Sequence, residues 1–253
     1  MLFLILRLFA FFIITFSLLP IQILIIFFFK NKSYIIPKIY HKICCKIFGI
    51  RIKYKGKISK LFPTLFVVNH ASYIDIIILS SLFETSFVAK KEVSSWPLLG
   101  FLSKLQNTLF IDRKVSSLKK QENLILNHLK NKKNLVIFPE GTSSDGNKVL
   151  SFKSSLFNIF NKKRNFSIYV QTATIIYKKV DGIKLNRTQR RDITWHSNMD
   201  LIPNICNLLK KMSIDIEVIF DKKIIPKKSI DRKELAFFCW KNINYSLINN
   251  LYK

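Results

Sequence analysis

The first group of residues that could perform chemistry is Asn69-His70-Ala71-Ser72-Tyr73-Ile74-Asp75, which follows a short apolar run. Imidazole is the side chain best suited to act as a general base near neutral pH. A carboxylate on its second ring nitrogen fixes the tautomer and stabilises the imidazolium that forms. His70 and Asp75 would meet if His70 precedes a helix and Asp75 lies on its first turns. On spacing alone, the simpler alternative is favoured, with Asp75 as an acid near a helix N-terminus and His70 as a turn residue.

A second group is Phe138-Pro139-Glu140-Gly141-Thr142-Ser143-Ser144-Asp145-Gly146, which follows another apolar run and holds two of the six glycines. Glu140 would lie at the carboxyl end of a strand, where α/β folds place ligand contacts. Gly141 permits a tight backbone path, and Thr142 and Ser143 supply hydroxyl groups. An ordinary strand-to-helix turn explains this loop equally well.

A third group, Phe110-Ile111-Asp112-Arg113, also follows an apolar run. The planar guanidinium of Arg113 suits a phosphate or a carboxylate, although an Asp–Arg surface pair is the better interpretation in isolation. The sequence has neither a Gly-x-Ser-x-Gly elbow nor a Walker loop, which argues against a serine hydrolase and a P-loop NTPase. The other three histidines lack metal-ligand spacing and are interpreted as structural, so no metal is expected: His41, His128 and His196.

In this order and spacing, the three groups together resemble the PlsC-type glycerolipid acyltransferases, a family with a His-x4-Asp motif. The resemblance covers roughly residues 60–180 and includes Phe87-Val88-Ala89-Lys90-Lys91-Glu92-Val93. It implies that His70 is the catalytic base and that Asp75 is its partner. It also implies an acceptor-binding set that consists of Arg113, matched to the arginine assigned to the acceptor phosphate, and of Glu140, Gly141, Thr142 and Lys153.

Four positions depart from the family pattern: Asn107 and Ser155 replace a glycine, Thr172 replaces a proline, and Ser143 replaces an arginine. The missing arginine at position 143 weakens the inference that the acceptor carries a phosphomonoester. The second group, followed by Phe152-Lys153-Ser154-Ser155, resembles a branch that includes both lysophosphatidate and lyso-ornithine lipid acyltransferases.

The resemblance therefore implies a membrane-bound O-acyltransferase that takes an acyl chain from an acyl thioester. The expected acceptor is the sn-2 hydroxyl of 1-acyl-sn-glycerol-3-phosphate, which would give phosphatidic acid for phospholipid biosynthesis, and lyso-ornithine lipid is the alternative. Acyl-CoA or acyl carrier protein would be the co-substrate, and no cofactor is expected. A remoter alternative is a non-catalytic basic module that binds a membrane or nucleic acid.

Short apolar strands that alternate with helices must position these groups, and this alternation predicts an α/β fold. The expected strands cover residues 64–69, 85–89, 107–111, 134–138, 167–176 and 214–220. The expected helices cover residues 33–48, 73–83, 116–131, 152–160 and 231–250, and a further helix starts at Pro97. We expect Ser72 to be the N-cap of the helix at 73–83, and we expect four residues of the helix at 116–131 to face inward: Leu118, Leu124, Ile125 and Leu129. The family resemblance implies a mixed sheet flanked by helices.

Residues 2–29 are almost wholly apolar and predict a membrane segment. A straight helix of this length would be about 42 Å long, against a hydrocarbon core of about 30 Å. Pro20 would kink or break it, so a single span and two short helices that dip into one leaflet both stay open. Ten basic residues and no acid follow at 30–60, which by the positive-inside rule places this side in the cytoplasm. We expect residues 1–60 to anchor the chain in the inner membrane and residues 61–253 to form the acyltransferase domain on its cytoplasmic face.

The charge of the chain is strongly positive, with 42 Lys+Arg against 15 Asp+Glu and a net charge of +27. Hydrophobic residues nevertheless make up 49%, which excludes a disordered basic tail. The densest basic stretch lies directly behind the apolar run, which favours an anionic membrane surface, a lysolipid and an anionic acyl donor as partners, and no nucleic acid is expected. The four cysteines have neither disulfide nor zinc spacing and predict reduced thiols.

Overall fold

One eight-stranded sheet organises the computed structural model, which describes residues 2–29, 32–112, 115–161, 165–227 and 230–251. The strands are β1 (Ile50–Lys55), β2 (Thr64–Val68), β3 (Ser86–Lys90), β4 (Leu109–Ile111), β5 (Leu135–Ile137), β6 (Tyr169–Val180), β7 (Ile183–Lys184) and β8 (Ile214–Phe220). They lie in the order β1-β8-β6-β2-β5-β3-β4, and β7 pairs with β6. Strand β6 is antiparallel to β7 and β8, and the other pairs are parallel. The predicted mixed sheet is therefore confirmed.

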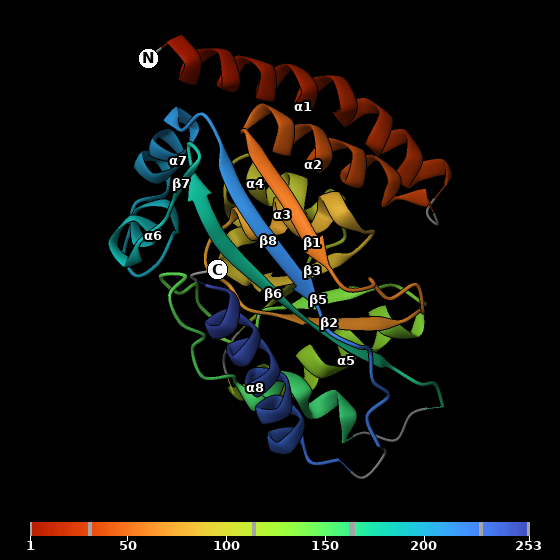
Figure 1. Cartoon of the computed structure of the whole chain (residues 1–253). Coiled ribbons are helices and arrows are strands. Elements are labelled where there is room, and N and C mark those ends of the chain that lie inside the picture. Colours follow the sequence, from red (N-terminus) through yellow and green to blue (C-terminus); the bar gives the residue numbers. More distant parts are fainter. Residues whose placement is uncertain (1, 30–31, 113–114, 162–164, 228–229, 252–253) are drawn as a thin grey trace.

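Helices cover both faces of this sheet (Figure 1). The α-helices are α1 (Leu2–Phe28), α2 (Ile35–Ile47), α3 (Ile74–Leu82), α4 (Leu99–Leu105), α5 (Leu118–Lys130), α6 (Arg187–Ile193), α7 (Leu201–Lys210) and α8 (Arg232–Asn250). Among the described residues the structure also has the short 3-10 helices η2 (Lys91–Ser95), η3 (Val115–Ser117) and η4 (Ser154–Phe160). Figure 1 shows α1 and α2 on one side of the sheet and α5 and α8 on the other.

Strand β2 lies at the centre of the sheet and is buried at all five positions. Successive side chains of a strand point to opposite faces. Phe66 and Val68 accordingly join the apolar core beneath α2 and α3, whereas Leu65 and Val67 join the core beneath α5 and α8. Because β2, β3, β4 and β5 run parallel, their carboxyl ends share one edge of the sheet. The loops that carry the three sequence groups emerge at this edge.

Two predictions about individual side chains were wrong. Tyr73, and not Ser72, is the N-cap residue of α3, and its side chain makes no capping bond. The carboxylate of Asp75 instead accepts the main-chain N–H groups of Ala71 and Ser72, so the turn is closed by an acid inside the helix. Leu124 on α5 is 40% exposed, because the buried face of this helix is centred on Ile125 and Leu129.

Several elements differ from their predicted form. Residues 154–160 form the 3-10 helix η4 where the sequence predicts an ordinary helix. Strand β1 and helices α6 and α7 have no counterpart among the predicted elements. Strand β1 pairs with β8 inside the sheet, so residues 50–55 of the expected anchoring region belong to the folded body.

Helix α1 continues through Pro20 without a break, so the apolar run is one helix. By length and composition it could cross a membrane. It lies against the body and is tied to it at two points by buried polar side chains. Arg7 donates to the main-chain carbonyls of Leu209 and Met212 beside α7, at 3.1 and 3.0 Å.

The second tie is Gln22, whose Nε2 donates to the carbonyls of Ser33 and Leu105 at 2.9 and 3.0 Å. Fifteen residues separate Gln22 from Arg7, so roughly 22 Å of helix is held along the body. The opposite face of α1 exposes large apolar side chains, among them Leu2, Phe9, Phe16 and Phe27. This exposed face and the two ties together describe a helix that lies across the surface of the protein.

Candidate active site

The side chain of Asn69 fixes the backbone at the carboxyl end of β2. Its Oδ1 accepts the N–H of Ile175 at 2.8 Å, and its Nδ2 donates to the carbonyl of Ile175 at 3.0 Å. Both bonds go to strand β6, so the amide extends the β2–β6 pairing by one residue. His70 therefore follows a residue whose side chain is fixed to β6 by two hydrogen bonds.

His70 and Asp75, five residues apart, meet as the sequence allows. The Nδ1 of His70 lies 2.9 Å from Oδ2 of Asp75, and the Asp75 side chain is fully buried. The same Oδ2 accepts the N–H groups of Ala71 and Ser72 at 2.7 and 3.0 Å. The carboxylate therefore accepts hydrogen bonds from three successive residues, His70 to Ser72. The two main-chain bonds close this turn and keep the imidazole of His70 next to the carboxylate.

The imidazole of His70 also stacks on the ring of Phe138, with centroids 4.1 Å apart and an interplanar angle of 18°. Phe138 begins the second sequence group, so two of the predicted groups are in direct contact. The His70 side chain is 18% exposed, whereas its partner is inaccessible. One edge of the ring can therefore reach a substrate while the other is held by the protein.

Glu140 braces this turn through the main chain. Its Oε1 accepts the N–H of His70 and its Oε2 accepts the N–H of Leu150, both at 2.8 Å. The residue is 3% exposed, and burial raises the pKa of its carboxyl group to about 8, with a smaller contribution from the charge of Asp75. Both oxygens accept main-chain N–H groups, so Glu140 joins the His70 turn to the segment at Leu150.

The loop after Glu140 packs against the same turn. The N–H of Ser144 donates to the carbonyl of His70 at 2.8 Å. Gly141 has φ of +72°, and a Cβ on it would lie 2.9 Å from Nζ of Lys153, so the absent side chain leaves room for this lysine. Thr142 and Lys153 are exposed at the surface of the loop. The structure therefore gathers the expected acceptor-binding residues, except Arg113, which lies outside the described residues.

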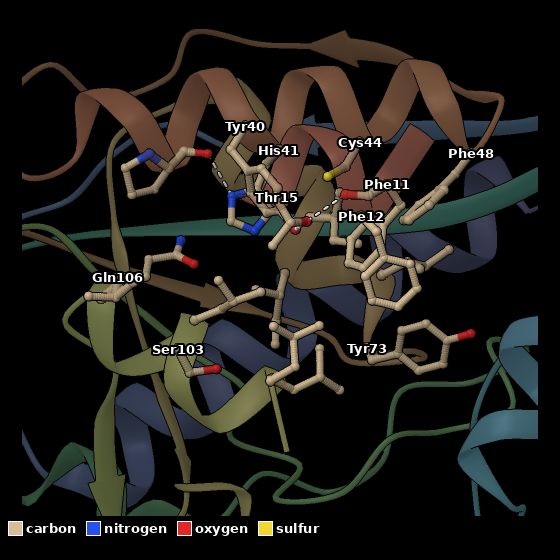
Figure 2. A pocket seen from close by; sticks show the side chains of 18 of the residues that line it. Phe11, Phe12, Thr15, Tyr40, His41, Cys44, Phe48, Tyr73, Ser103 and Gln106 are labelled. Atoms are coloured by element: carbon tan, nitrogen blue, oxygen red, sulfur yellow. Dashed lines mark hydrogen bonds between the residues drawn. The ribbon is translucent and has the colours of Figure 1, made fainter. Parts of the chain in front are cut away.

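A cavity of about 370 Å³ lies beside this site, under α1 and α2 (Figure 2). Its wall is almost wholly apolar and comes from α1, α2, α3, α4 and α7. Figure 2 shows Phe11, Phe12, Phe48 and Tyr73 around it. Tyr73 directly follows the His70–Ser72 turn, so at this residue the wall of the cavity adjoins the candidate site.

The long-range residues of the site were not found from the sequence. Tyr177 on β6 donates its hydroxyl to Oδ1 of Asp75 at 2.6 Å. Its place in an apolar strand, two residues after Ile175, predicts the face on which it lies, but does not identify Asp75 as its partner. His41 and His128, interpreted as structural, are buried, and burial lowers the pKa of each to about 4.

Comparisons with known proteins show the family to which this fold and sequence are similar. A family model described as Acyltransferase matches residues 50–178. The chain is 35% identical over 228 residues to the "Lyso-ornithine lipid O-acyltransferase" of Brucella abortus (strain 2308), covering 88% of this chain and 85% of that protein. It is 35% identical over 94 residues to a "1-acyl-sn-glycerol-3-phosphate acyltransferase" of Neisseria gonorrhoeae, covering 37% of each.

Among solved structures, the 1-acyl-sn-glycerophosphate acyltransferase PlsC of Thermotoga maritima has the same fold. The TM-score is 0.67 at 18% identity, and the match covers 97% of this chain and 95% of that one. The family expected from the three sequence groups is thus confirmed by a family model, by relatives and by the fold. The chain belongs to the PlsC-type acyltransferase family.

Proposed function

We propose that this acyltransferase forms an ester between an acyl chain and a hydroxyl group of lyso-ornithine lipid. The observation that carries the chemistry is the His70–Asp75 pair, with its 2.9 Å contact and its buried carboxylate. The acceptor is supported by the identity with the Brucella abortus protein, which extends over 88% of this chain. The acceptor that the sequence alone favours, 1-acyl-sn-glycerol-3-phosphate, becomes the second candidate.

His70 acts as the general base of the transfer. Because its Nδ1 faces a carboxylate, Nδ1 carries the ring proton and Nε2 keeps a free lone pair. Nε2 takes the proton of the acceptor hydroxyl while the hydroxyl oxygen attacks the thioester carbonyl. The tetrahedral intermediate collapses with cleavage of the C–S bond, and the imidazolium returns the proton to the thiolate. The products are the ester and the free thiol, and Asp75 stabilises the imidazolium between the two steps.

Lys153 supplies positive charge for the acceptor. Its ammonium group lies over Gly141, on the loop that contacts the His70 turn. Ornithine lipid carries a carboxylate and lysophosphatidate carries a phosphate, and a lysine or arginine attracts either anion. We infer that Lys153 and Arg113 hold this anionic group, while Glu140 keeps the His70 backbone in place.

The apolar cavity under α1 and α2 receives an acyl chain. A volume of about 370 Å³ falls within the range of roughly 300–1,000 Å³ that is usual for small-molecule pockets. Its wall offers apolar contacts along its whole length and adjoins the His70 turn through Tyr73. The donor is an acyl thioester, with acyl-CoA or acyl carrier protein as the carrier.

Helix α1 seats the enzyme on the membrane. The ties at Arg7 and Gln22 hold it along the body, so its exposed apolar face enters one leaflet while the body stays outside. The basic stretch behind it suits the anionic cytoplasmic leaflet. We propose that the protein lies on the cytoplasmic face of the inner membrane with α1 in the plane of the interface.

The second candidate function is acylation of 1-acyl-sn-glycerol-3-phosphate. The identity with the Neisseria gonorrhoeae protein favours it, although that match covers 37% of this chain. The two candidates differ in the anionic group of the acceptor and share the same base and donor.

An acceptor assay separates the two candidates. Membranes that contain the full chain are given lyso-ornithine lipid or lysophosphatidate, each with acyl-CoA and with acylated acyl carrier protein. We expect ester formation on lyso-ornithine lipid, and we expect none from membranes that contain His70→Ala at the same protein level. Turnover of lysophosphatidate alone would support the second candidate, and no turnover with any pair would refute both.

A further inference from the structure

The carboxylate of Asp75 receives donors on both of its oxygens. Oδ2 accepts from His70 and from the amides of the following turn, as described above. Oδ1 accepts the hydroxyl of Tyr177 at 2.6 Å, the shortest of these contacts. Tyr177 is 102 residues further along the chain and 1% exposed. Tyr177 takes no part in the proton transfers proposed for His70.

The position of Tyr177 is fixed by its own backbone. It lies in β6 opposite Ile216 of β8. Its carbonyl accepts Nε of the fully buried Arg190 at 3.1 Å, and Nη1 of the same guanidinium donates to Oδ1 of Asn147 at 2.6 Å. Asn147 belongs to the loop that begins at Glu140. The hydroxyl of Tyr177 is therefore held by the sheet and by the candidate acceptor loop together.

The hydroxyl of Tyr177 acts as a donor at any working pH. Burial and then the negative charge of Asp75 raise its pKa well above the ordinary value, so it keeps its proton. The other titratable or charged groups around the pair are His70, Glu140, Tyr73 and Arg190. Burial also raises the pKa of Glu140 and of Tyr73, so near neutral pH neither adds a negative charge beside Asp75.

We propose that Tyr177 is a positioning residue for acyl transfer, which fixes the rotation of the Asp75 carboxylate and sets how tightly the His70–Asp75 pair holds a proton. The proposal rests on the proposed function of His70 as the base. Without the hydroxyl, Oδ1 would have no described donor from β6, and the donors on Oδ2 would be left to fix the plane of the carboxylate, which would be held less firmly about its terminal bond. The imidazole would then lose part of its fixed orientation.

The direction of the effect on protonation follows from charge. The hydroxyl of Tyr177 stabilises the Asp75 carboxylate more strongly when His70 is neutral than when His70 is an imidazolium. The reason is that the carboxylate and the imidazolium together form a nearly neutral ion pair. Loss of the hydroxyl therefore favours the protonated pair. The acid limb of the pH–rate profile should move to higher pH by about half a unit to one unit, so kcat/KM on that limb should fall by about three- to tenfold and recover at higher pH.

The test is Tyr177→Phe in the purified full chain, with Tyr34→Phe as the matched control. Tyr34 is also buried, and its hydroxyl lies 3.1 Å from Oγ of Ser86, away from Asp75. Both variants are compared with the wild type over the pH–rate profile, on the acceptor that the wild type uses. We expect the shift of the acid limb for Tyr177→Phe and not for Tyr34→Phe.

A second measurement does not depend on turnover. The chain has four histidines, so ¹⁵N-histidine spectra are simple, and His70→Ala assigns the signal of His70. Its titration should move upward in Tyr177→Phe. If the proposed acceptor is wrong, the rate assay fails while this titration still responds, so the two failures are distinguishable.

A third arm keeps the hydrogen bond and therefore the fold. Incorporation of 3-fluorotyrosine at position 177 gives a more acidic hydroxyl, which is a stronger donor to Asp75. The titration of His70 and the acid limb should then move to lower pH. The proposal is overturned if Tyr177→Phe and Tyr34→Phe titrate alike, or if fluorotyrosine leaves both readouts at the wild-type position. If Tyr177→Phe does not fold, the fluorotyrosine arm alone decides.

Discussion

Replacing Asp75 by asparagine removes one negative charge from the proposed site while keeping its shape. Three donors converge on Oδ2, so the amide oxygen of the substituted side chain will take that position and still accept from His70. The amide nitrogen then faces Tyr177, whose hydroxyl can rotate to accept a hydrogen bond. The ring of His70 keeps its tautomer, and the variant isolates the loss of charge.

The size of the effect follows from the separation of the charges. Two unit charges about 4 Å apart interact with about 4 kcal/mol at an effective dielectric constant of about 20. The imidazolium that forms during transfer loses this stabilisation in Asp75→Asn. We therefore expect kcat to fall by roughly 10³-fold, because each 1.36 kcal/mol on the barrier corresponds to about a factor of ten. KM should change little, since Asp75 is fully buried and does not reach the substrate.

The assay is steady-state acyl transfer by purified protein, together with thermal unfolding. Asp75→Asn should unfold within a few degrees of the wild type. Asp75→Ala, which leaves the amides of Ala71 and Ser72 without their acceptor, should unfold clearly earlier. Asp215→Asn on β8 makes the same chemical change away from the site and serves as the control. Turnover of Asp75→Asn within about tenfold of the wild type would refute the proposed function of the charge.

Three further predictions concern the framework of the site. Asn69→Ala leaves the buried N–H and carbonyl of Ile175 without partners and should lower the free energy of unfolding by about 2–4 kcal/mol in denaturant titrations. Because burial raises the pKa of Glu140 from 4.5 to about 8, the folded state binds this proton more tightly than the unfolded chain. The free energy of unfolding should therefore fall as the pH rises through this window, by at most about 1.4 kcal/mol per unit, and Glu140→Gln, which cannot titrate, should flatten the profile. Arg7→Leu removes one tie of α1, so limited proteolysis should cleave between α1 and α2 faster than in the wild type; an equal rate would contradict the described packing.

Local patterns predicted the parts of the site that depend on nearby residues. His70 and Asp75 meet because a strand end and a helix start five residues apart bring them together. The central strands were predictable because burial on both faces requires an unbroken apolar run, as in β2. Asn107, which was noted only as a replacement of the glycine usual in the family, has φ of +58°, and Asn is one of the few residues that tolerate this conformation.

Contacts between residues on different strands of the sheet could not be predicted from the sequence. Tyr177 reaches Asp75 only because β6 pairs with β2 in one register, and no local pattern states that register. Strand β1 was hidden for a different reason. Its alternation of Ile50, Ile52 and Tyr54 with basic residues has the period of a strand. The same basic residues led to its interpretation as part of the basic stretch that follows the apolar run. Helix α7 was also not predicted. Its Pro203 lies in the first turn, where a helix tolerates proline.

The main-chain N–H groups of the His70 turn are possible donors to the negatively charged oxygen of the tetrahedral intermediate. The amides of Ala71 and Ser72 are bound to Asp75, and the amide of His70 is bound to Glu140. All three N–H groups therefore donate to acidic side chains before a substrate arrives. These three amides are therefore not free to stabilise an oxyanion, so the donors of the oxyanion hole must come from other residues.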